Sequence, residues 1–388
     1  MGAFLIGTRQ GIFDLEWSIR CPSCFGPADV QEELAALKNH AHCAGCRVDI
    51  DNAALDSEVE VCFKVGGSVR PDEPPHFTEI IKAWVTFDFL QKKEVAPGSK
   101  WVYDADIPAG PYKVFTDGFR ARAAFLVEAA AKTPDKEIRF DLKENGLEWH
   151  AGARAPGRYA IRFRNSTASP VNFNFARALE APWVSGLDVA SNQLFRDMFS
   201  GELISADASF SVKNIVLLFT DIRGSTDLYE RRGDARAYAL VKEHFRILFE
   251  SVRRHNGAVV KTIGDAVMAS FLTPTDAMAA IFDAHDRFEI FNERSSENPI
   301  VIKAGVHGGA CLAVTLNDAL DYFGRMVNLA ARIQGESRGG DIVVSRTLHG
   351  SAGVGKMASD LGWSASVKTA GLKGIEDEVG LVVLTRGR

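Results

Sequence analysis

The chain has 388 residues, enough for two or three domains with their own hydrophobic cores. Hydrophobic residues make up 46% of it and charged residues 24%, a globular composition that excludes a mostly disordered or collagen-like chain. The net charge of −5 gives no general attraction to nucleic acid or anionic lipid. No run approaches the ~20 apolar residues of a membrane helix, and Asp14 and Glu16 stand where a signal peptide would be cleaved, so we expect a cytoplasmic protein.

Two CxxC pairs near the N-terminus are the first sign of a metal site. Eighteen residues separate them, a spacing typical of a Cys₄ zinc ribbon. We expect residues 1–50 to hold a structural Zn²⁺; its candidate ligands are Cys21, Cys24, Cys43 and Cys46, with His40 and His42 as substitutes. Four thiolates leave no open position for a substrate, so catalysis at this metal is not expected. The alternative is that the thiols are free, and Cys62 and Cys311 are most simply core residues.

Strand patterns dominate residues 51–180, which we expect to form a mainly antiparallel β domain. Apolar and polar residues alternate, the period of a half-buried strand, over 59–65, 138–142, 159–163 and 171–175. The turn-rich sequence NSTASP at 165–170 predicts that the last two strands pair as a hairpin. Two helices are expected in this front part, one over 30–40 and one over 119–132.

Residues 181–208 are interpreted as a linker with a short amphipathic helix over 189–199, and residues 209–388 as an α+β domain. In that domain strands and helices follow the order β-α-β-β-α-β over 215–219, 234–252, 257–265, 266–272, 276–292 and 300–306, with a further helix over 325–334. The apolar stripe predicted for the first long helix is Tyr238, Val241, Phe245, Leu248, Phe249 and Val252.

The segment FTDIRGST is the first of three that carry chemistry. Asp221 ends an apolar strand, and the small residues Gly224, Ser225 and Thr226 leave backbone N–H groups open at a strand-to-helix turn. Such a turn is a plausible phosphate cradle, and a carboxylate beside it suits Mg²⁺. Taken alone, Asp221 is equally well explained as a cap of the following helix.

The other two segments are KTIGD and DYFGRMVNLAARI. Lys261 and Asp265 flank a hairpin turn, so Asp265 could meet Asp221 across neighbouring strands and hold two metal ions. By itself, a Gly-Asp hairpin tip is ordinary turn chemistry. Asn328 and Arg332 are four residues apart on one helix face, where Arg332 offers a permanent planar cation. By themselves, Asn328 and Arg332 are equally well explained as polar residues on a solvated helix face.

In their order and spacing the three segments resemble the catalytic domain of class III nucleotidyl cyclases, over about residues 213–384. The resemblance implies a class III cyclase α/β sandwich with a ferredoxin-like βαββαβ core, preceded here by the zinc ribbon and the β domain. It implies two Mg²⁺ or Mn²⁺ ions per active site, bound by Asp221, Asp265 and the backbone of Ile222.

The resemblance also assigns the nucleotide contacts. Lys261 and Asp321 would read the base, Asn328 would orient the ribose, and Arg332 would stabilise charge at the α-phosphate. The metal and phosphate region would be lined by Phe219, Ile222, Gly224, Ser225 and Thr226, with Lys373 as the candidate for the terminal phosphates.

The base-reading pair favours ATP, because a lysine donates to a ring nitrogen of adenine and a carboxylate accepts from its N6 amine, whereas guanine presents an O6 acceptor. The resemblance therefore implies an adenylate cyclase that forms 3′,5′-cyclic AMP and pyrophosphate. Its sites would be shared between the two catalytic domains of a head-to-tail homodimer. The alternatives are a catalytically silent nucleotide-binding regulatory protein and a guanylate cyclase.

The front half resembles the regulatory region of bacterial soluble cyclases. It either responds to an unidentified ligand or protein, or it only stabilises or dimerises the enzyme. Nucleic-acid binding ranks last, because basic and aromatic residues are not interleaved there. The segment 302–321 is short beside the hairpin that helps many family members to dimerise.

Overall fold

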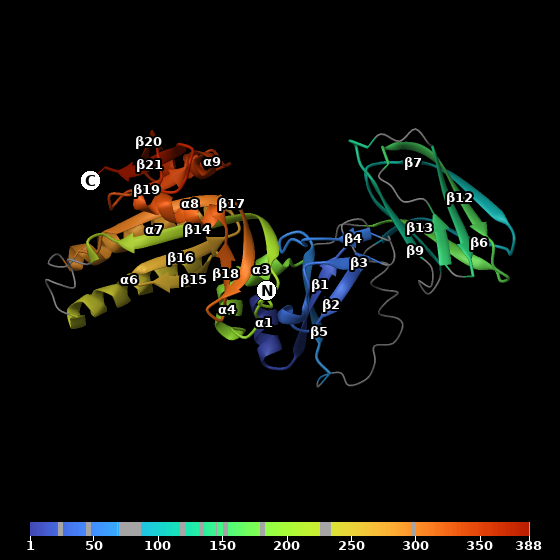
Figure 1. Ribbon diagram of the computed structural model, residues 1–388, viewed down its shortest axis with the longest axis horizontal. Helices are drawn as coiled ribbons and strands as arrows, with labels where there is room; N and C mark the ends of the chain where they lie inside the picture. Colours follow the sequence, from blue (N-terminus) through green and yellow to red (C-terminus); the bar gives the residue numbers. More distant parts are fainter. Residues whose placement is uncertain are drawn as a thin grey trace.

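The computed structural model describes residues 1–21, 26–43, 48–67, 69, 87–116, 122–131, 136–144, 146–149, 154–178, 183–225, 234–295 and 299–387. Figure 1 shows three parts: a small N-terminal unit in the middle, a β-sandwich at one end and a large unit of mixed α/β structure at the other. None of the described helices is long and apolar enough to cross a membrane.

The N-terminal unit is a small three-stranded sheet with short flanking elements. Its elements are α1 (Gly2–Arg9), β1 (Phe13–Arg20), β2 (Pro27–Gln31), the 3₁₀ turn η1 (Leu34–Ala36), β3 (Ala41–Cys43), β4 (Val48–Ile50) and β5 (Val59–Val65). The sheet order is β2-β1-β5, and β3 pairs with β4. The predicted strand over 59–65 is confirmed. The predicted helix over 30–40 is wrong, because a single 3₁₀ turn buries Leu34 and Leu37 between extended residues.

The second part is a sandwich of two four-stranded sheets. Its strands are β6 (Phe87–Val95), β7 (Lys100–Ile107), β8 (Gly110–Thr116), β9 (Arg122–Val127), β10 (Glu137–Lys143), β11 (Gly146–Trp149), β12 (Gly157–Asn165) and β13 (Val171–Ala178). One sheet has the order β11-β10-β12-β7 and the other β6-β13-β8-β9. The predicted strands within β10, β12 and β13 are confirmed. Stacked aromatic rings, such as Phe140 on Phe163, fill the space between the sheets.

The predicted hairpin of the last two strands is wrong, because β12 and β13 belong to different sheets. The connecting turn is bound to the opposite sheet by the fully buried Asn165, whose Nδ2 donates to the carbonyls of Val95 (2.9 Å) and Ser169 (2.8 Å). The chain therefore crosses from one sheet to the other at this corner.

The predicted helix over 119–132 is also wrong where the structure describes it, because 122–127 forms β9. Phe125 and Val127 face the sandwich core, whereas Ala124 belongs to the core of the N-terminal unit. A strand buried on both faces lacks the alternation that would distinguish it from a buried helix.

The third part is a long sheet with helices. The linker forms α3 (Gly186–Ala190) and α4 (Gln193–Met198), which replace the single predicted helix. Then follow β14 (Phe210–Ile222), α6 (Asp234–Arg254), β15 (Ala258–Ile263), β16 (Ala266–Phe271), α7 (Pro274–Arg294), β17 (Ile302–Leu316), β18 (Ala319–Phe323) and α8 (Arg325–Gly335). The C-terminal elements are β19 (Ile342–Ser345), α9 (Arg346–His349), α10 (Val354–Asp360), β20 (Trp363–Ala370) and β21 (Val379–Arg386).

The strand order of this sheet is β15-β16-β14-β17-β19-β21-β20, with β18 paired to β17. The predicted order of strands and helices from β14 to β17 is confirmed, as is the helix at α8. The helices α6 and α7 pack over one face of the sheet through residues such as Leu248 and Phe282. Tyr238 does not share in this contact, contrary to the predicted stripe, because it is 68% exposed.

The N-terminal unit covers part of the other face and shares one hydrophobic core with α4, α8 and the sheet. Trp17 of β1 packs edge-on against Phe195 of α4, with ring centroids 5.9 Å apart. The backbone N–H of Leu55 donates to the carbonyl of Ser211 in β14 (2.7 Å). The N-terminal unit and the third part are therefore joined by one continuous hydrophobic core and by backbone hydrogen bonding.

Gly305 of β17 permits the close approach of α8, since a Cβ atom there would lie 2.2 Å from the backbone N of Gln334. We predict that Gly305→Ala forces α8 away from the sheet and lowers the free energy of unfolding by about 1–3 kcal/mol, the usual range for overpacking. Urea unfolding measures this loss.

Gly371→Ala is the matched control, because a Cβ atom at that exposed position meets nothing within 4 Å. It should change the free energy of unfolding by less than about 0.5 kcal/mol. Equal stability of the two variants would contradict the close packing of α8.

Candidate active site

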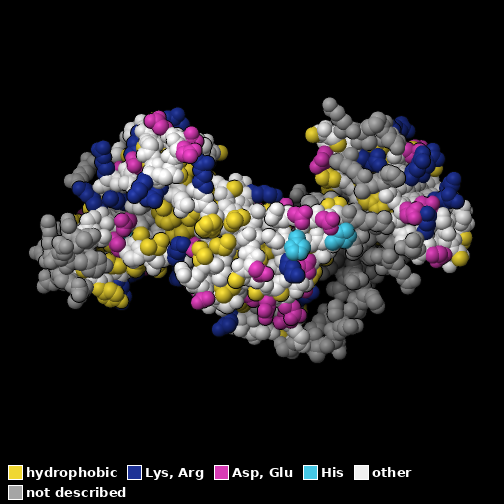
Figure 2. All heavy atoms as spheres, in the orientation of Figure 1, with side chains coloured by type: hydrophobic (Ala, Val, Ile, Leu, Met, Phe, Trp, Pro, Cys, Tyr) yellow, Lys and Arg dark blue, Asp and Glu magenta, His cyan; other side chains and the backbone are white. Residues whose placement is uncertain are grey.

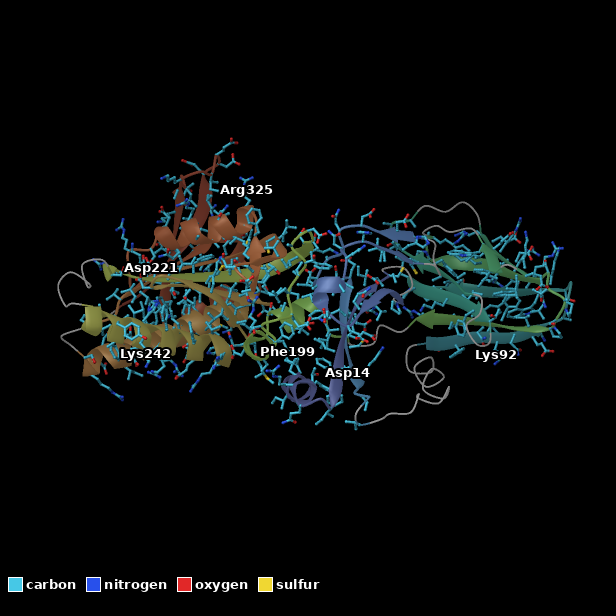
Figure 3. All side chains as sticks on the ribbon, turned by 60° about the horizontal axis from the view of Figure 1, so that its bottom comes forward. Asp14, Lys92, Phe199, Asp221, Lys242 and Arg325 are labelled. Carbon is cyan, nitrogen blue, oxygen red and sulfur yellow. The ribbon has the colours of Figure 1, made fainter. Side chains whose placement is uncertain are left out.

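Two carboxylates meet at one end of the large sheet. Asp221 lies near the C-terminal end of β14, the end remote from Phe199 in Figure 3. Thr220 pairs with Val267 of β16, which brings Asp221 beside the turn that carries Asp265. The backbone N–H of Ile222 donates to Oδ2 of Asp265 (3.3 Å). The two aspartates that the sequence analysis paired are therefore neighbours.

The electrostatics of this pair are unfavourable without a cation. Partial burial, followed by the neighbouring charge of Asp265, raises the pKa of Asp221 to about 6. Lys303, which lies opposite Asp221 across the β14–β17 ladder, offsets part of that rise. Two hard oxygen donors that repel each other are the ligand set that Mg²⁺ or Mn²⁺ would neutralise.

His244 of α6 supports Asp265 and was missed by the sequence analysis. It is fully buried, burial lowers its pKa to about 4, and its Nε2 lies 3.1 Å from the carbonyl oxygen of Asp265. The neutral ring can donate to that carbonyl and hold the turn. A signal was present, because position 244 lies three residues after Val241 and four before Leu248 on the predicted buried stripe.

Lys261 and Asp321 form a second pair, across β15 and β18. Lys261 Nζ makes an ion pair with Oδ2 of Asp321, which is 4% exposed. The other oxygen, Oδ1, accepts from the backbone N–H of Tyr322 (2.8 Å). A β-bulge at Val260 directly precedes the lysine. Bulges of this kind redirect side chains at functional sites.

The remaining site candidates lie apart from these pairs. Asn328 and Arg332 are exposed on α8, and within the described residues neither side chain makes a hydrogen bond or ion pair. Phe219 and Ile222 are buried in β14, and Gly224 follows them with a φ of +70°. Ser225 is half-buried. Thr226 lies outside the described residues, and Lys373 is exposed between β20 and β21.

The structure thus brings together Asp221 with Asp265 and Lys261 with Asp321. It leaves the polar face of α8, with Asn328 and Arg332, open to solvent. A single chain therefore presents two sets of candidate site residues, one at the carboxylate pair and one on an exposed helix face.

Only half of the proposed zinc ligands can be placed. Cys21 and Cys43 are buried in the core of the N-terminal unit, whereas Cys24 and Cys46 lie outside the described residues. His42 makes a 2.7 Å contact with Asp49 on the surface. Across the described parts of the chain, no three His, Cys, Asp or Glu side chains are gathered as a metal cluster. Of the two cysteines expected in cores, Cys311 is buried and Cys62 half-buried.

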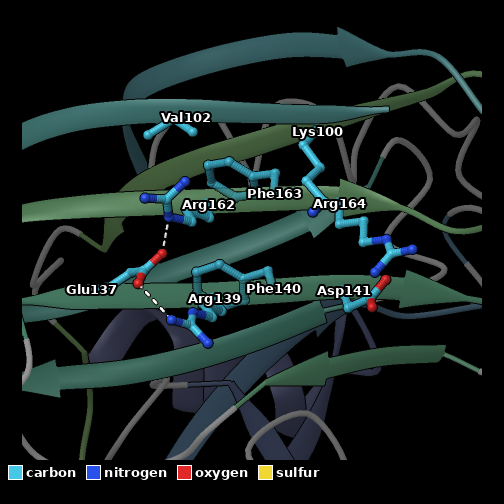
Figure 4. A pocket seen from close by; sticks show the side chains of 9 residues that line it. All are labelled: Lys100, Val102, Glu137, Arg139, Phe140, Asp141, Arg162, Phe163 and Arg164. Atoms are coloured by element: carbon cyan, nitrogen blue, oxygen red, sulfur yellow. Dashed lines mark hydrogen bonds and ion pairs between the residues drawn. The ribbon is translucent and has the colours of Figure 1, made fainter. Parts of the chain in front are cut away.

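A hollow of about 410 Å³ lies away from these residues, on the outer face of the sandwich. Figure 4 shows that charged side chains line it and that Glu137 pairs with both Arg139 (2.7 Å) and Arg162. The pair with Arg139 lies within β10, whereas the pair with Arg162 joins β10 to β12, and cross-strand pairs of the second kind stabilise an exposed sheet face. We therefore interpret the hollow as a feature of the charged outer face of this sheet.

Two protein families match different parts of the chain. Residues 208–371 match the family described as the adenylate and guanylate cyclase catalytic domain. Residues 1–136 match a family of unknown function, DUF5939. The first match covers the carboxylate pair, the Lys261–Asp321 pair and α8.

Curated relatives agree with the first match. The chain is 30% identical to an adenylate cyclase of Neurospora crassa over 260 residues, which are 60% of this chain and 11% of that protein. It is 30% identical over 187 residues to an adenylate cyclase of Mycosarcoma maydis, covering 43% of this chain and 7% of that protein. Adenylate cyclase 2 of Rhizobium meliloti is 29% identical over 177 residues, 42% of this chain and 48% of that protein.

The chain thus spans less than half the length of each of these relatives. Together with the family match, they support a cyclase catalytic domain in the C-terminal part of the chain.

Solved structures with local similarity include the adenylyl cyclase CyaB from P. aeruginosa, with a TM-score of 0.40 and 23% identity over 46% of this chain and 97% of that chain. The guanylate cyclase domain of RhGC from Catenaria anguillulae has a TM-score of 0.39 and 21% identity over 46% of this chain and 99% of that chain.

The raised pKa of Asp221 gives a pH-dependent prediction for the metal-free protein. A group whose pKa is raised by folding stabilises the fold below its unfolded pKa of ~3.9, and this contribution is lost as the pH rises through the folded value. That folded value is about 6. At about pH 8 in EDTA, Asp221→Asn should therefore raise the free energy of unfolding, by an amount on the order of 1 kcal/mol after solvent screening.

Urea unfolding at about pH 8 and about pH 4 measures the effect, which should vanish at the lower pH. Asp360→Asn is the control, because that exposed aspartate pairs only with Lys356 among the described residues. A loss of stability in Asp221→Asn at pH 8 would contradict the repulsion between the two carboxylates.

Proposed function

We propose that the protein is an adenylate cyclase that converts ATP to 3′,5′-cyclic AMP and pyrophosphate. In this reaction the ribose 3′-oxygen bonds to the α-phosphorus as the bond from that phosphorus to pyrophosphate breaks. The observation that carries the proposal is the pair of facing carboxylates, Asp221 and Asp265, at the end of β14. The observed order β14-α6-β15-β16-α7-β17 supports the ferredoxin-like core that the proposal requires.

The carboxylate pair, with the backbone of Ile222, would hold two Mg²⁺ or Mn²⁺ ions, whose chemistry is to neutralise the triphosphate and lower the pKa of the attacking hydroxyl. The chain's own residues would bind and orient the nucleotide. Gly224 and Ser225 offer backbone N–H groups to phosphate at the turn after β14. Positioning and fixed charge account for most catalysis of phosphoryl transfer.

The Lys261–Asp321 pair would read the base. In the free protein the lysine and the buried carboxylate satisfy each other. Adenine can replace this contact with equivalent ones, because its ring nitrogen accepts from the lysine and its N6 amine donates to the carboxylate. Guanine places an O6 acceptor at that position, and the ionised carboxylate repels it.

We propose a head-to-tail homodimer that completes each site. Asn328 and Arg332 are exposed on α8, so they can reach a nucleotide bound at the carboxylate pair of a second copy. The β17–β18 hairpin carries exposed Leu312, Leu316 and Phe323, and Figure 2 shows hydrophobic side chains gathered over this side of the α/β part. An apolar patch of this kind favours protein association.

The N-terminal unit is proposed to regulate this activity, because it shares a core with the sheet that carries the site. The structural Zn²⁺ at the four cysteines and the phosphate contact of Lys373 remain predictions.

The first experiment tests the reaction and the base together. The purified chain is incubated with equal concentrations of ATP and GTP plus Mn²⁺, and cyclic nucleotides and pyrophosphate are quantified by mass spectrometry. We expect cyclic AMP in excess. Dominant cyclic GMP would overturn the assignment of the base-reading pair, and the absence of both products would overturn the proposed activity.

The shared site predicts complementation between two inactive variants. Asp221→Ala and Arg332→Ala should each lose nearly all turnover. An equal mixture should recover about a quarter of the wild-type rate, because half of the dimers are mixed and each mixed dimer keeps one intact site of two.

Asp221→Ala mixed with Asp265→Ala is the matched control. Both changes damage the carboxylate pair, so every site in a mixed dimer lacks one carboxylate and no activity should return. Recovery in this control, or none in the first mixture, would rule out the shared site.

A further inference from the structure

The strands that carry the Lys261–Asp321 pair each have an edge without a neighbouring strand in the described sheet. β15 ends the sheet and is bonded only to β16, and β18 is bonded only to β17. Within the described sheet they are joined through β16, β14 and β17, so twist along this path changes the distance between them, and a further contact is needed to keep that distance fixed. An ion pair between two side chains needs such a fixed distance if it is to bind one base and reject another.

The helix α4 bridges the two strands. Arg196 Nη1 donates to the carbonyl of Leu320 in β18 (2.8 Å), the residue before Asp321. Its Nε donates to the carbonyl of Ala190 at the end of α3 (2.7 Å). The guanidinium also lies over the ring of Tyr322, 5.7 Å from its centroid. Arg196 therefore ties β18 to the linker through three contacts.

The same helix binds β15 through Gln193. Its Oε1 accepts from the backbone N–H of Val259 (2.6 Å), two residues before Lys261 and next to the bulge at Val260. Its Nε2 donates to Asp197, one turn along α4 (2.8 Å). Both the oxygen and the nitrogen of the Gln193 side-chain amide are thus hydrogen-bonded.

One short helix therefore satisfies a backbone group beside each member of the base-reading pair. The hydroxyl of the buried Tyr322 adds a contact to Ser191 Oγ (3.3 Å). The ring of Phe195, also on α4, is packed against Trp17 of the N-terminal unit. Packing continues from the N-terminal unit through α4 to both strands.

We propose that Arg196 and Gln193 are positioning residues that fix the Lys261–Asp321 pair and thereby set the preference for the adenine base. This inference rests on the proposed function, because it takes Lys261 and Asp321 as the base-reading residues. It adds that the linker, through its contacts to β15 and β18, determines how well the pair discriminates between purine bases.

The test compares Arg196→Met with Arg246→Met. Both variants lose an arginine, but among the described residues the ion pairs of Arg246 are with Glu243 and Glu250 of its own helix α6, and not with α4, β15 or β18. Initial rates with ATP and with GTP give kcat and KM for each. We expect Arg196→Met to raise the KM for ATP about 5- to 10-fold and to lower the ATP/GTP ratio of kcat/KM by a similar factor.

The kcat for ATP should stay within about twofold, because the groups at the α-phosphate are untouched. Arg196→Lys should recover only part of the ATP preference, since an ammonium group cannot hold both carbonyls in the fixed geometry of a guanidinium fork. Arg246→Met should leave both KM values unchanged. An equal fall in kcat for both nucleotides, with the KM ratio intact, would overturn the positioning role.

Hydrogen exchange tests the same contacts without turnover. Amides of residues 319–323 should exchange faster in Arg196→Met than in the wild type. Amides of residues 258–261 should exchange faster in Gln193→Leu, and this variant tests the proposal if Arg196→Met does not fold. Unchanged exchange at both strands would overturn the positioning role, whereas a wild-type protein that turns over neither nucleotide would overturn the proposed function alone.

Discussion

The register of β14 is the constraint on which the candidate site depends. This strand is paired on one edge with β16 and on the other with β17, so its side chains cannot slip relative to either neighbour. A shift by one residue would move Asp221 to the opposite face of the sheet and away from Asp265. The free energy that holds two repelling carboxylates together comes from this pairing and from the packing of α6 and α7 behind it.

The opposite face of the same sheet has a different covering. There, the N-terminal unit, α4 and α8 share one core with β14, and Trp17 and Phe195 are among its fully buried members. Buried cores transmit displacement, because side chains in close packing have few alternative positions. The N-terminal unit thus shares its core with β18 and α8. The carboxylate pair lies at the far end of β14.

Local pattern was a good guide where one face of an element is buried and the other is exposed. The helix α8 and the hairpin of β15 and β16 lie within a few residues of their predicted bounds, because alternation or helical spacing is visible in such segments. Prediction from local pattern failed where a strand is buried on both faces, and where the contact that decides the topology is made with a residue distant in the sequence. β9 is apolar on both faces, and β12 and β13 separate because Asn165 bonds to Val95, 70 residues earlier in the chain.

The sequence by itself determined the chemical inventory of the protein: which carboxylates, cations and small residues are present, and at what spacing along the chain. That was enough to place Asp221 and Asp265 at neighbouring turns and Asn328 and Arg332 on one face of a helix. Only the tertiary structure decided which other groups support them. His244 beneath Asp265, Lys303 across from Asp221 and Arg196 beside Asp321 take their roles from contacts between segments 21 to 124 residues apart. Periodicity reports on neighbours within one or two turns, and it carries no information about which edge or face a distant segment will cover.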